Sequence, residues 1–167
     1  MRNDDSGRYF LYTHSPIFGS AAVLWSIFHD EPKIFRILLS RQGVTAEAYV
    51  SDFFRDCSSG TCRMIDSVAG DIEAFLSGKD ISFSLSLVRM DLCSGFQQKV
   101  LITEHAIPRG HVSTYQRIAE QIGNPGASRA VGNALARNPF PIIIPCHRAI
   151  RSDRTLGGYQ GGTDMKR

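Results

Sequence analysis

The segment Ile142–Arg148 limits the structures open to this chain more than any other stretch. Three consecutive isoleucines are followed by Pro145, Cys146 and His147. An apolar run belongs in a protein interior, and free cysteines are among the most buried residues. Burial raises the pKa of a thiol, so a reactive Cys146 needs a specific activator. His147 is the nearest candidate base, although neighbours on a strand point to opposite faces. A structural cysteine in a core strand is the alternative interpretation.

Further motifs lie on both sides of this segment. Asn138-Pro139 precedes it, and Gly157-Gly158-Tyr159 follows it. Together with Pro145-Cys146-His147-Arg148, they resemble the active-site region of the O6-alkylguanine-DNA alkyltransferases, the methylated-DNA–protein-cysteine methyltransferase family. The resemblance extends from about Ser94 to Lys166 and is much weaker in the N-terminal half.

The resemblance implies direct DNA repair by alkyl transfer from O6-alkylguanine, or from O4-alkylthymine, to Cys146. The sulfur attacks the alkyl carbon, and the protein reacts once because a thioether is not hydrolysed as a thioester is. By resemblance, His147 takes the thiol proton through a water molecule. Asn138 is matched to an asparagine that braces the turn between the recognition helix and the active-site strand. The implied reaction needs no metal and no cofactor.

The resemblance also assigns the residues that contact the substrate. Tyr115 is matched to a tyrosine that pushes on the phosphate beside the target nucleotide. Arg129 is matched to the arginine that fills the gap left by the flipped-out nucleotide. We interpret Arg148 as structural support for the motif. The implied guanine pocket comprises Tyr115, Pro145, Ala149, Tyr159, Gln160 and Gly161.

Two short helices are expected in the C-terminal half, where they form a helix-turn-helix. The first is predicted over 114–122, with a capping box made by Ser113 at the N-cap and Gln116 at N3. The second is predicted over 125–137, with Asn124 as its N-cap and a proline as its first residue.

The second of these helices is rich in small residues, which let a helix approach another surface closely. That surface is either a neighbouring helix or DNA. Few long polar side chains are present to read base edges in the major groove. Close approach without base reading favours the minor groove, which the resemblance also implies. The expected DNA-binding residues are Tyr115, Ala127, Ser128, Arg129, Ala130 and Gly132.

Charge is distributed unevenly along the chain. Residues 1–91 hold 9 Lys and Arg against 12 Asp and Glu, a net charge of −3, whereas residues 92–167 hold 10 against 4, a net charge of +6. A basic half joined to an acidic half is typical of a polyanion-binding domain with a second domain attached. The expected partner is double-stranded DNA that contains an alkylated guanine.

The predicted fold class is α/β (α+β) with two domains. Residues 1–90 are expected to form a supporting domain with a small antiparallel sheet and helices. Residues 91–167 are expected to form a winged helix-turn-helix-like domain that binds DNA and carries the active site. Aromatic and apolar runs predict strands over 8–14, 21–28 and 33–40, with a turn over 29–32. Helices are predicted over 46–54, from 61 or 62 to 76, and over 95–104 with Ser94 as its cap, and period two over 80–90 predicts a strand or an extended linker.

Composition narrows the class of protein. The chain is 43% hydrophobic and 21% charged, which is ordinary for a globular protein. It has no apolar run of the roughly 18 residues that a membrane span needs, and its first seven residues are polar. We expect an intracellular monomer without membrane association, cytoplasmic, or nuclear in a eukaryote. A zinc site at Cys57 and Cys62, completed by His14 or His29, is a minor alternative.

One family feature has no counterpart in the sequence. The family places a glutamate beyond the lysine that Lys166 matches, where it orients the histidine, and this sequence stops at Arg167. Asp153 and Asp164 are the nearest acids along the chain. The missing acid leaves open a second function, a non-catalytic sensor that binds and flips alkylated bases. A Cys-His hydrolase is a third interpretation, which leaves the helix-turn-helix unexplained.

Overall fold

The structure, a computed structural model, describes residues 7–41 and 43–166, so the polar N-terminal segment discussed above lies almost wholly outside it. The chain divides into two compact units, Met1–Arg89 and Met90–Arg167. The predicted combination of a small antiparallel sheet with helices and a helix-turn-helix unit is confirmed. No helix within the described residues is long and apolar enough to cross a membrane.

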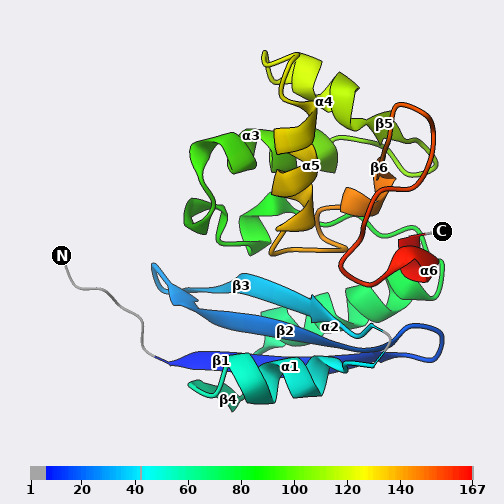
Figure 1. The fold of residues 1–167 in the computed structure, drawn as a ribbon. Helices are drawn as coiled ribbons and strands as arrows, with labels where there is room; N and C mark the ends of the chain where they lie inside the picture. The colour runs from blue at the N-terminus through cyan, green and yellow to red at the C-terminus, as the bar shows by residue number, and fades with distance from the viewer. Residues whose placement is uncertain (1–6, 42, 167) are drawn as a thin grey trace. The chain divides into compact units, whose positions relative to one another are not determined.

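The first unit is built on a four-stranded sheet (Figure 1). Strands β1 (Arg8–Ser15), β2 (Gly19–Phe28) and β3 (Glu31–Leu39) form the predicted antiparallel meander. A short strand that the sequence did not predict, β4 (Cys57–Ser59), pairs in parallel with β1. The strand order is β3-β2-β1-β4, which puts the apolar strand β2 inside the sheet.

The connection between β2 and β3 is tighter than predicted. Only His29 and Asp30 form the turn, both with positive φ, at 51° and 62°. A two-residue hairpin loop of this kind matches the twist of its strands. The prediction that Glu31 and Pro32 belong to the turn was wrong. Pro32 lies in β3, at the end of the sheet order, where a residue without an N–H is tolerated.

Two helices cover opposite faces of this sheet. Helix α1 (Ala46–Phe53) is capped by Thr45 and packs its buried side on the face that carries Leu24. Helix α2 (Arg63–Leu76) packs against β1, where the Thr13 hydroxyl donates to Glu73 at 2.7 Å. Thr13 and Leu24 belong to opposite faces because side chains alternate along paired strands.

The segment 80–90 is extended but is not a regular strand. Two short 3₁₀ turns, η1 (Leu85–Leu87) and η2 (Met90–Leu92), interrupt it. Its one ladder contact among the described residues is an isolated bridge between Val88 and Ile34. Of the two predicted alternatives, a strand or an extended linker, the segment is therefore an extended linker.

The second unit is mainly helical. Helices α3 (Gly95–His105), α4 (Tyr115–Gln121) and α5 (Ser128–Ala136) pack on one another around a fully buried apolar core (Figure 1). Parallel pairing of β5 (Ser113–Thr114) with β6 (Ala149–Ile150) ties the start of α4 to the cysteine segment. The 3₁₀ turn η3 (Cys146–Arg148) and helix α6 (Thr163–Lys166) complete the unit, whose core includes Val100, Leu101, Ile118, Val131, Leu135 and Phe140.

The predicted capping box of α4 was wrong by one residue. Thr114, not Ser113, is the N-cap, and its hydroxyl accepts from the Arg117 N–H at 3.1 Å. Ser113 is instead part of β5, so a pairing with a distant strand decides where the helix begins. Gln116 does not complete the capping box, and its amide donates to the Pro125 carbonyl at 2.9 Å.

The predicted start of α5 was also wrong. The helix begins at Ser128 rather than 125, and Asn124 closes a turn by accepting from the Ala127 N–H at 2.9 Å. The reason lies at the end of α4. Gly123 has φ 77°, and the N–H groups of Gly123 and Asn124 bond to the Glu120 and Ala119 carbonyls. Asn124 therefore ends one helix and is not free to begin the next.

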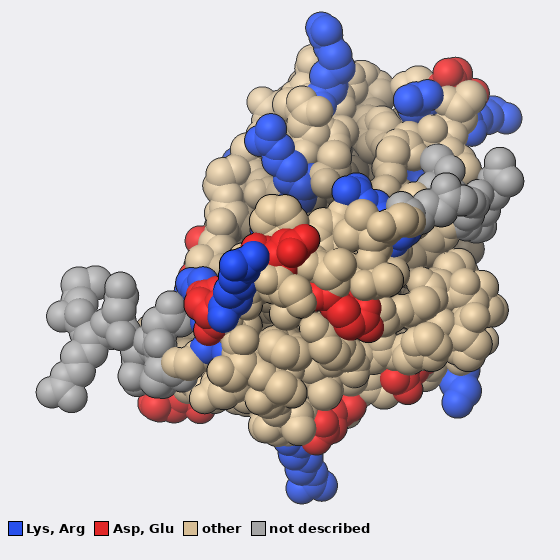
Figure 2. Space-filling model, turned by 60° about the horizontal axis from the view of Figure 1, so that its bottom comes forward, with Lys and Arg blue, Asp and Glu red and all other residues tan. Residues whose placement is uncertain are grey.

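Charged side chains are mixed by sign on the face drawn in Figure 2. Among the residues coloured there, single Lys and Arg side chains and single Asp and Glu side chains are scattered over a largely neutral surface. Scattered charges of both signs do not make the continuous positive potential that attracts a polyanion.

Candidate active site

The cysteine segment is buried but is not a strand. Cys146 is 7% exposed and begins the 3₁₀ turn η3, and the three isoleucines before it are at most 2% exposed. Pro139, Pro141 and Pro145 lack the N–H that a central strand needs. Ile142 has φ 74°, which a strand does not allow. The expectation of an active-site strand was therefore wrong, and the segment is an irregular buried loop.

Asn138 holds this loop in place. Its amide nitrogen donates to the Ile144 carbonyl at 3.1 Å and to the Cys146 sulfur at 3.2 Å. Its carbonyl oxygen accepts from the Phe140 N–H at 2.9 Å. The side chain is only 4% exposed, so each of these bonds satisfies a group that water does not reach.

The environment of Cys146 keeps its thiol protonated at neutral pH. Burial raises the pKa of the Cys146 thiol to about 12, and Glu104 acts in the same direction when it is ionised. The Asn138 hydrogen bond and the positive charge of Lys166 act in the opposite direction. A nucleophilic sulfur here therefore depends on a base that removes the proton.

His147 is in the state that a base requires. Burial lowers the pKa of its imidazole to about 4, and the positive charges of Arg148 and Lys166 lower it further. The ring is therefore uncharged at neutral pH and can accept a proton. It lies edge-on to Tyr159, with ring centroids 6.0 Å apart.

The segment after β6 closes around Tyr115. A Cβ added to Gly157 would lie 2.0 Å from the Tyr115 hydroxyl oxygen, so only glycine allows this approach. The buried Lys166 donates to the Gly158 carbonyl at 3.3 Å, and its nitrogen lies 5.9 Å from the centre of the Tyr115 ring. Burial and the charge of Glu104 raise the pKa of Tyr115, so its hydroxyl keeps its proton.

The remaining residues of the predicted guanine pocket lie near these groups along the chain. Pro145 and Ala149 are buried on either side of η3, and Tyr159, Gln160 and Gly161 are half-buried. The Gln160 side-chain oxygen is buried without a hydrogen-bond partner among the described residues.

Glu104 was missed by the sequence analysis. It lies in the last turn of α3, is fully buried, and faces Lys166, Arg148 and Tyr115. Its position gave a signal, because it follows Val100 by four residues and Leu101 by three, on the buried side of the helix. Asp153, considered from the sequence, is exposed and bonded to Thr155, and the side chain of Asp164 lies outside the described part.

Of the predicted DNA-binding residues, Tyr115 begins α4 and Ala127 precedes α5, and the others lie on the outer side of α5. Val131, Ala134 and Leu135 are buried on its inner side. Arg129 and Ala130 are exposed, and Ala127, Ser128 and Gly132 are half-buried. A Cβ added to Gly132 would meet no atom within 4 Å. Tight packing against a neighbouring helix therefore does not explain this glycine.

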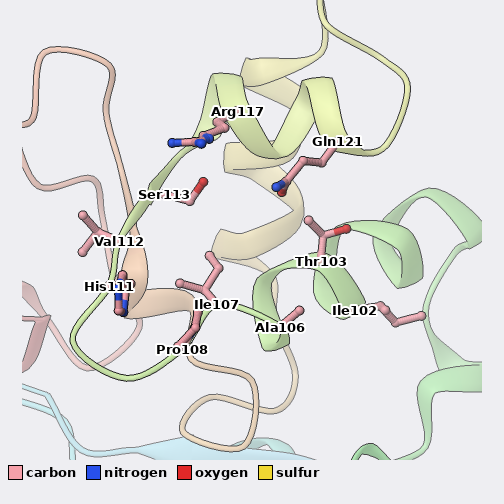
Figure 3. A pocket seen from close by; sticks show the side chains of 10 residues that line it. All are labelled: Ile102, Thr103, Ala106, Ile107, Pro108, His111, Val112, Ser113, Arg117 and Gln121. Atoms are coloured by element: carbon pink, nitrogen blue, oxygen red, sulfur yellow. The ribbon is translucent and has the colours of Figure 1, made fainter.

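Two places outside this site bear on ligand binding. No cluster of three His, Cys, Asp or Glu side chains suited to a metal is found within the described ranges, and Cys57 and Cys62 are free thiols. A hollow of about 490 Å³ lies between the end of α3 and the start of α4, lined by Ile107, Val112 and Arg117 among others (Figure 3). None of the predicted site residues lines it.

The geometry can be compared with known proteins. The family model for the DNA-binding domain of 6-O-methylguanine DNA methyltransferase matches residues 95–167. The methylated-DNA–protein-cysteine methyltransferase of Methanothermobacter thermautotrophicus is 44% identical over 105 residues, covering 63% of this chain and 56% of that protein. The protein of the same name from Methanosarcina barkeri is 49% identical over 104 residues, covering 62% of this chain and 65% of that protein.

A solved structure extends the likeness to both units. The crystal structure of Mycobacterium tuberculosis OGT in complex with DNA matches with a TM-score of 0.75 and 31% identity, covering 95% of this chain and 88% of that one. The alignments to the two curated relatives, by contrast, span between about half and two thirds of those proteins. The likeness to the solved structure runs through almost all of both chains, and the chain belongs to the methylated-DNA–protein-cysteine methyltransferase family.

Proposed function

We propose that this protein repairs DNA by moving the alkyl group of O6-alkylguanine to Cys146 in a single turnover. The observation that carries the proposal is the buried thiol, which accepts a hydrogen bond from Asn138 at 3.2 Å and is followed by the uncharged imidazole of His147. O4-alkylthymine, which carries its alkyl group on a comparable ring oxygen, is a second proposed substrate.

The proposed reaction is a displacement at the alkyl carbon. The bond between Cys146 sulfur and that carbon forms while the bond to the guanine O6 breaks, and its electron pair stays on the oxygen. His147 accepts the thiol proton, directly or through one water, because its imidazole is uncharged. The guanine anion then takes up one proton, for which the Tyr115 hydroxyl is the proposed donor, and the proton held by His147 returns to the Tyr115 phenolate through solvent. The products are guanine and S-alkylcysteine.

The substrate must leave the duplex to reach a buried sulfur. An enzyme that acts on a base flips it out of the stack, and the cost is lowest for a damaged pair. The outer side of α5 suits close approach to the minor groove, because it combines exposed Arg129 with small residues and open space at Gly132. Arg129 is proposed to fill the gap that the flipped nucleotide leaves.

One copy of the chain holds every group that the proposal uses. All of them belong to the unit Met90–Arg167, so we propose a monomer in which the unit Met1–Arg89 supports the active one. The proposed substrate is chromosomal DNA. The proposed place of action is therefore the cytoplasm of a prokaryotic cell or the nucleus of a eukaryotic one.

The decisive experiment is intact-mass analysis after mixing the protein with a duplex that contains one O6-methylguanine. We expect one methyl group on the wild-type protein, mapped to Cys146, and none on Cys146→Ala. Binding to the methylated duplex without any gain in mass would overturn the proposal in favour of a non-catalytic damage sensor.

A second experiment tests the DNA surface. We expect Arg129→Ala to weaken binding to duplex DNA and to reduce the fluorescence of a base analogue at the flipped position. Arg55→Ala, an exposed arginine of the first unit, is the matched control. A minor-groove ligand should compete with the protein, and a failure to compete would contradict the minor-groove assignment.

A further inference from the structure

Glu104 is a buried acid whose position is not explained by the mechanism above. It is 0% exposed, at the end of α3, and neither carboxylate oxygen makes a well-formed hydrogen bond among the described residues, although the Ala149 backbone N–H lies close enough to lower the pKa of the carboxyl. A buried polar group without partners is costly, and an ionised one is more costly still. Helix stability alone would favour an apolar side chain here, so the carboxyl calls for a functional explanation.

The groups that face Glu104 are those of the active site. Helix α3 packs against η3, α4 and α5. From η3 come Cys146 and Arg148, from α4 comes Tyr115, and from α6 comes Lys166. The buried residues of helix α5 are apolar. The positive charge of Arg151 lowers the pKa values of Tyr115 and Lys166.

Lys166 and Glu104 act on the Cys146 sulfur with opposite signs. The ammonium group stabilises a thiolate, and an ionised Glu104 destabilises it. Lys166 is itself 5% exposed and is held by the Gly158 carbonyl, so solvent screens its charge only weakly. The protonation state of Glu104 therefore changes the net charge that the sulfur experiences.

We propose that Glu104 is a positioning residue of this active site, a buried carboxyl that controls how much of the positive charge of Lys166 acts on the Cys146 sulfur. The inference rests on the proposed alkyl transfer for its biological meaning. The charge relationship itself concerns only the thiol and can be measured without DNA.

The pKa of the Cys146 thiol should differ between the protonated and the ionised state of Glu104. Burial raises the pKa of Glu104 to about 8, so the carboxyl is mostly uncharged at neutral pH. In that state the charge of Lys166 acts unopposed and favours the thiolate. Above pH 8 the carboxyl ionises. Its negative charge then offsets the positive charges of Lys166 and Arg148 and makes the Cys146 thiol harder to deprotonate. At any given pH, a protonated Glu104 therefore allows a larger fraction of Cys146 to be thiolate than an ionised Glu104 does.

The test is the rate of alkylation of Cys146 by iodoacetamide between pH 6 and pH 10, read by peptide mass mapping. The sulfur displaces iodide and only the thiolate reacts. In the wild-type protein we expect the logarithm of the rate to rise with pH, to flatten around pH 8, and then to rise again. In Glu104→Gln we expect the same rates below pH 7, no flattening, and rates on the order of fivefold higher above pH 9.

Two controls accompany this test. Cys57 and Cys62, in the other unit, should react at the same rates in both proteins. Glu120→Gln, an exposed acid of α4, changes the same charge and should leave the Cys146 profile unchanged. The wild-type profile needs no variant, so a failure of Glu104→Gln to fold does not remove the test.

Two results would overturn the inference: a wild-type profile without a break near pH 8, or a Glu104→Gln profile displaced equally at all pH values, which indicates packing alone. Repeating the profiles with the methylated duplex separates the two proposals. A wild-type protein that reacts with iodoacetamide as expected but takes no methyl group from DNA contradicts the proposed function and leaves the role of Glu104 intact.

Discussion

The Asn138 amide nitrogen lies 3.2 Å from the Cys146 sulfur and donates a hydrogen bond to it. The same side chain accepts from the Phe140 N–H and donates to the Ile144 carbonyl. One residue at the end of α5 therefore fixes both the irregular loop and the atom at its end. This bond lowers the pKa of a thiol that burial raises.

Asn138→Ala should weaken both the fold and the nucleophile. Loss of one partner leaves buried groups unsatisfied, which costs about 1–3 kcal/mol of unfolding free energy for each group. The pKa of the Cys146 thiol should rise, because a donor to the sulfur is lost. Urea unfolding measures the first effect and thiolate ultraviolet absorbance the second. Asn133→Ala, at an exposed position of α5, is the control and should change neither.

Much of this arrangement could be predicted from the sequence because its signals are local. Ser94 was predicted as an N-cap, and its hydroxyl accepts a hydrogen bond from the N–H three residues on. The meander was readable from runs of aromatic and apolar residues. The cysteine segment and its flanking motifs lie close together along the chain, and for that reason the family could be identified from them.

The errors came from interactions between residues distant in sequence. Ser113 was assigned to a helix cap, but its backbone pairs with Ala149 in a sheet. Glu104 was passed over because a glutamate near a helix end usually faces solvent. Its spacing from Val100 and Leu101 indicated a buried position on α3. The charges of Lys166 and Arg148 act on it only after folding, and no local pattern shows that these residues lie near it.

The rate of the proposed methyl transfer should fall only at unusually low pH. The pKa of His147 is lowered to about 4, so the base form persists down to about that pH and is lost below it. We expect single-turnover methyl transfer to fall only below pH 5, and not near pH 6.5. His147→Gln should slow transfer by about a hundredfold, a typical loss of general-base catalysis. Quench-flow rates between pH 4 and pH 8 measure both, with exposed His111→Gln as the control.

Gly132→Leu should separate folding from DNA binding. A side chain at this position meets no atom within 4 Å, and replacing a helical glycine favours the helix by about 1 kcal/mol at most. We therefore expect unfolding free energy to stay equal or rise. Affinity for duplex DNA should fall by about tenfold or more, because the leucine blocks close approach to a narrow groove. Gly70→Leu, an equally open helical glycine of α2, should leave affinity unchanged.

Gly157→Ala should disturb the site through Tyr115. The added methyl group would lie 2.0 Å from the Tyr115 hydroxyl oxygen, so the ring must move from its position beside Lys166. The mobile end of a side chain can yield, and we expect only a small loss of thermal stability. Methyl transfer should fall by about tenfold or more, since a displaced group no longer meets the reacting geometry. Gly158→Ala is the matched neighbour, with nothing within 4 Å, and equal losses in both variants would contradict the role given to Tyr115.

The stability of the protein should depend on Glu104 in a direction opposite to that of most acids. Its pKa is raised from 4.5 to about 8 in the folded state, so between these values the folded chain holds a proton that the unfolded chain has lost. The unfolding free energy therefore falls as pH rises through this window. The contribution is at most roughly 5 kcal/mol, at about 1.4 kcal/mol for each pKa unit. Glu104→Gln should flatten this slope in urea unfolding between pH 5 and pH 9. Parallel curves for the wild-type and variant proteins would mean that the carboxyl ionises normally within the fold.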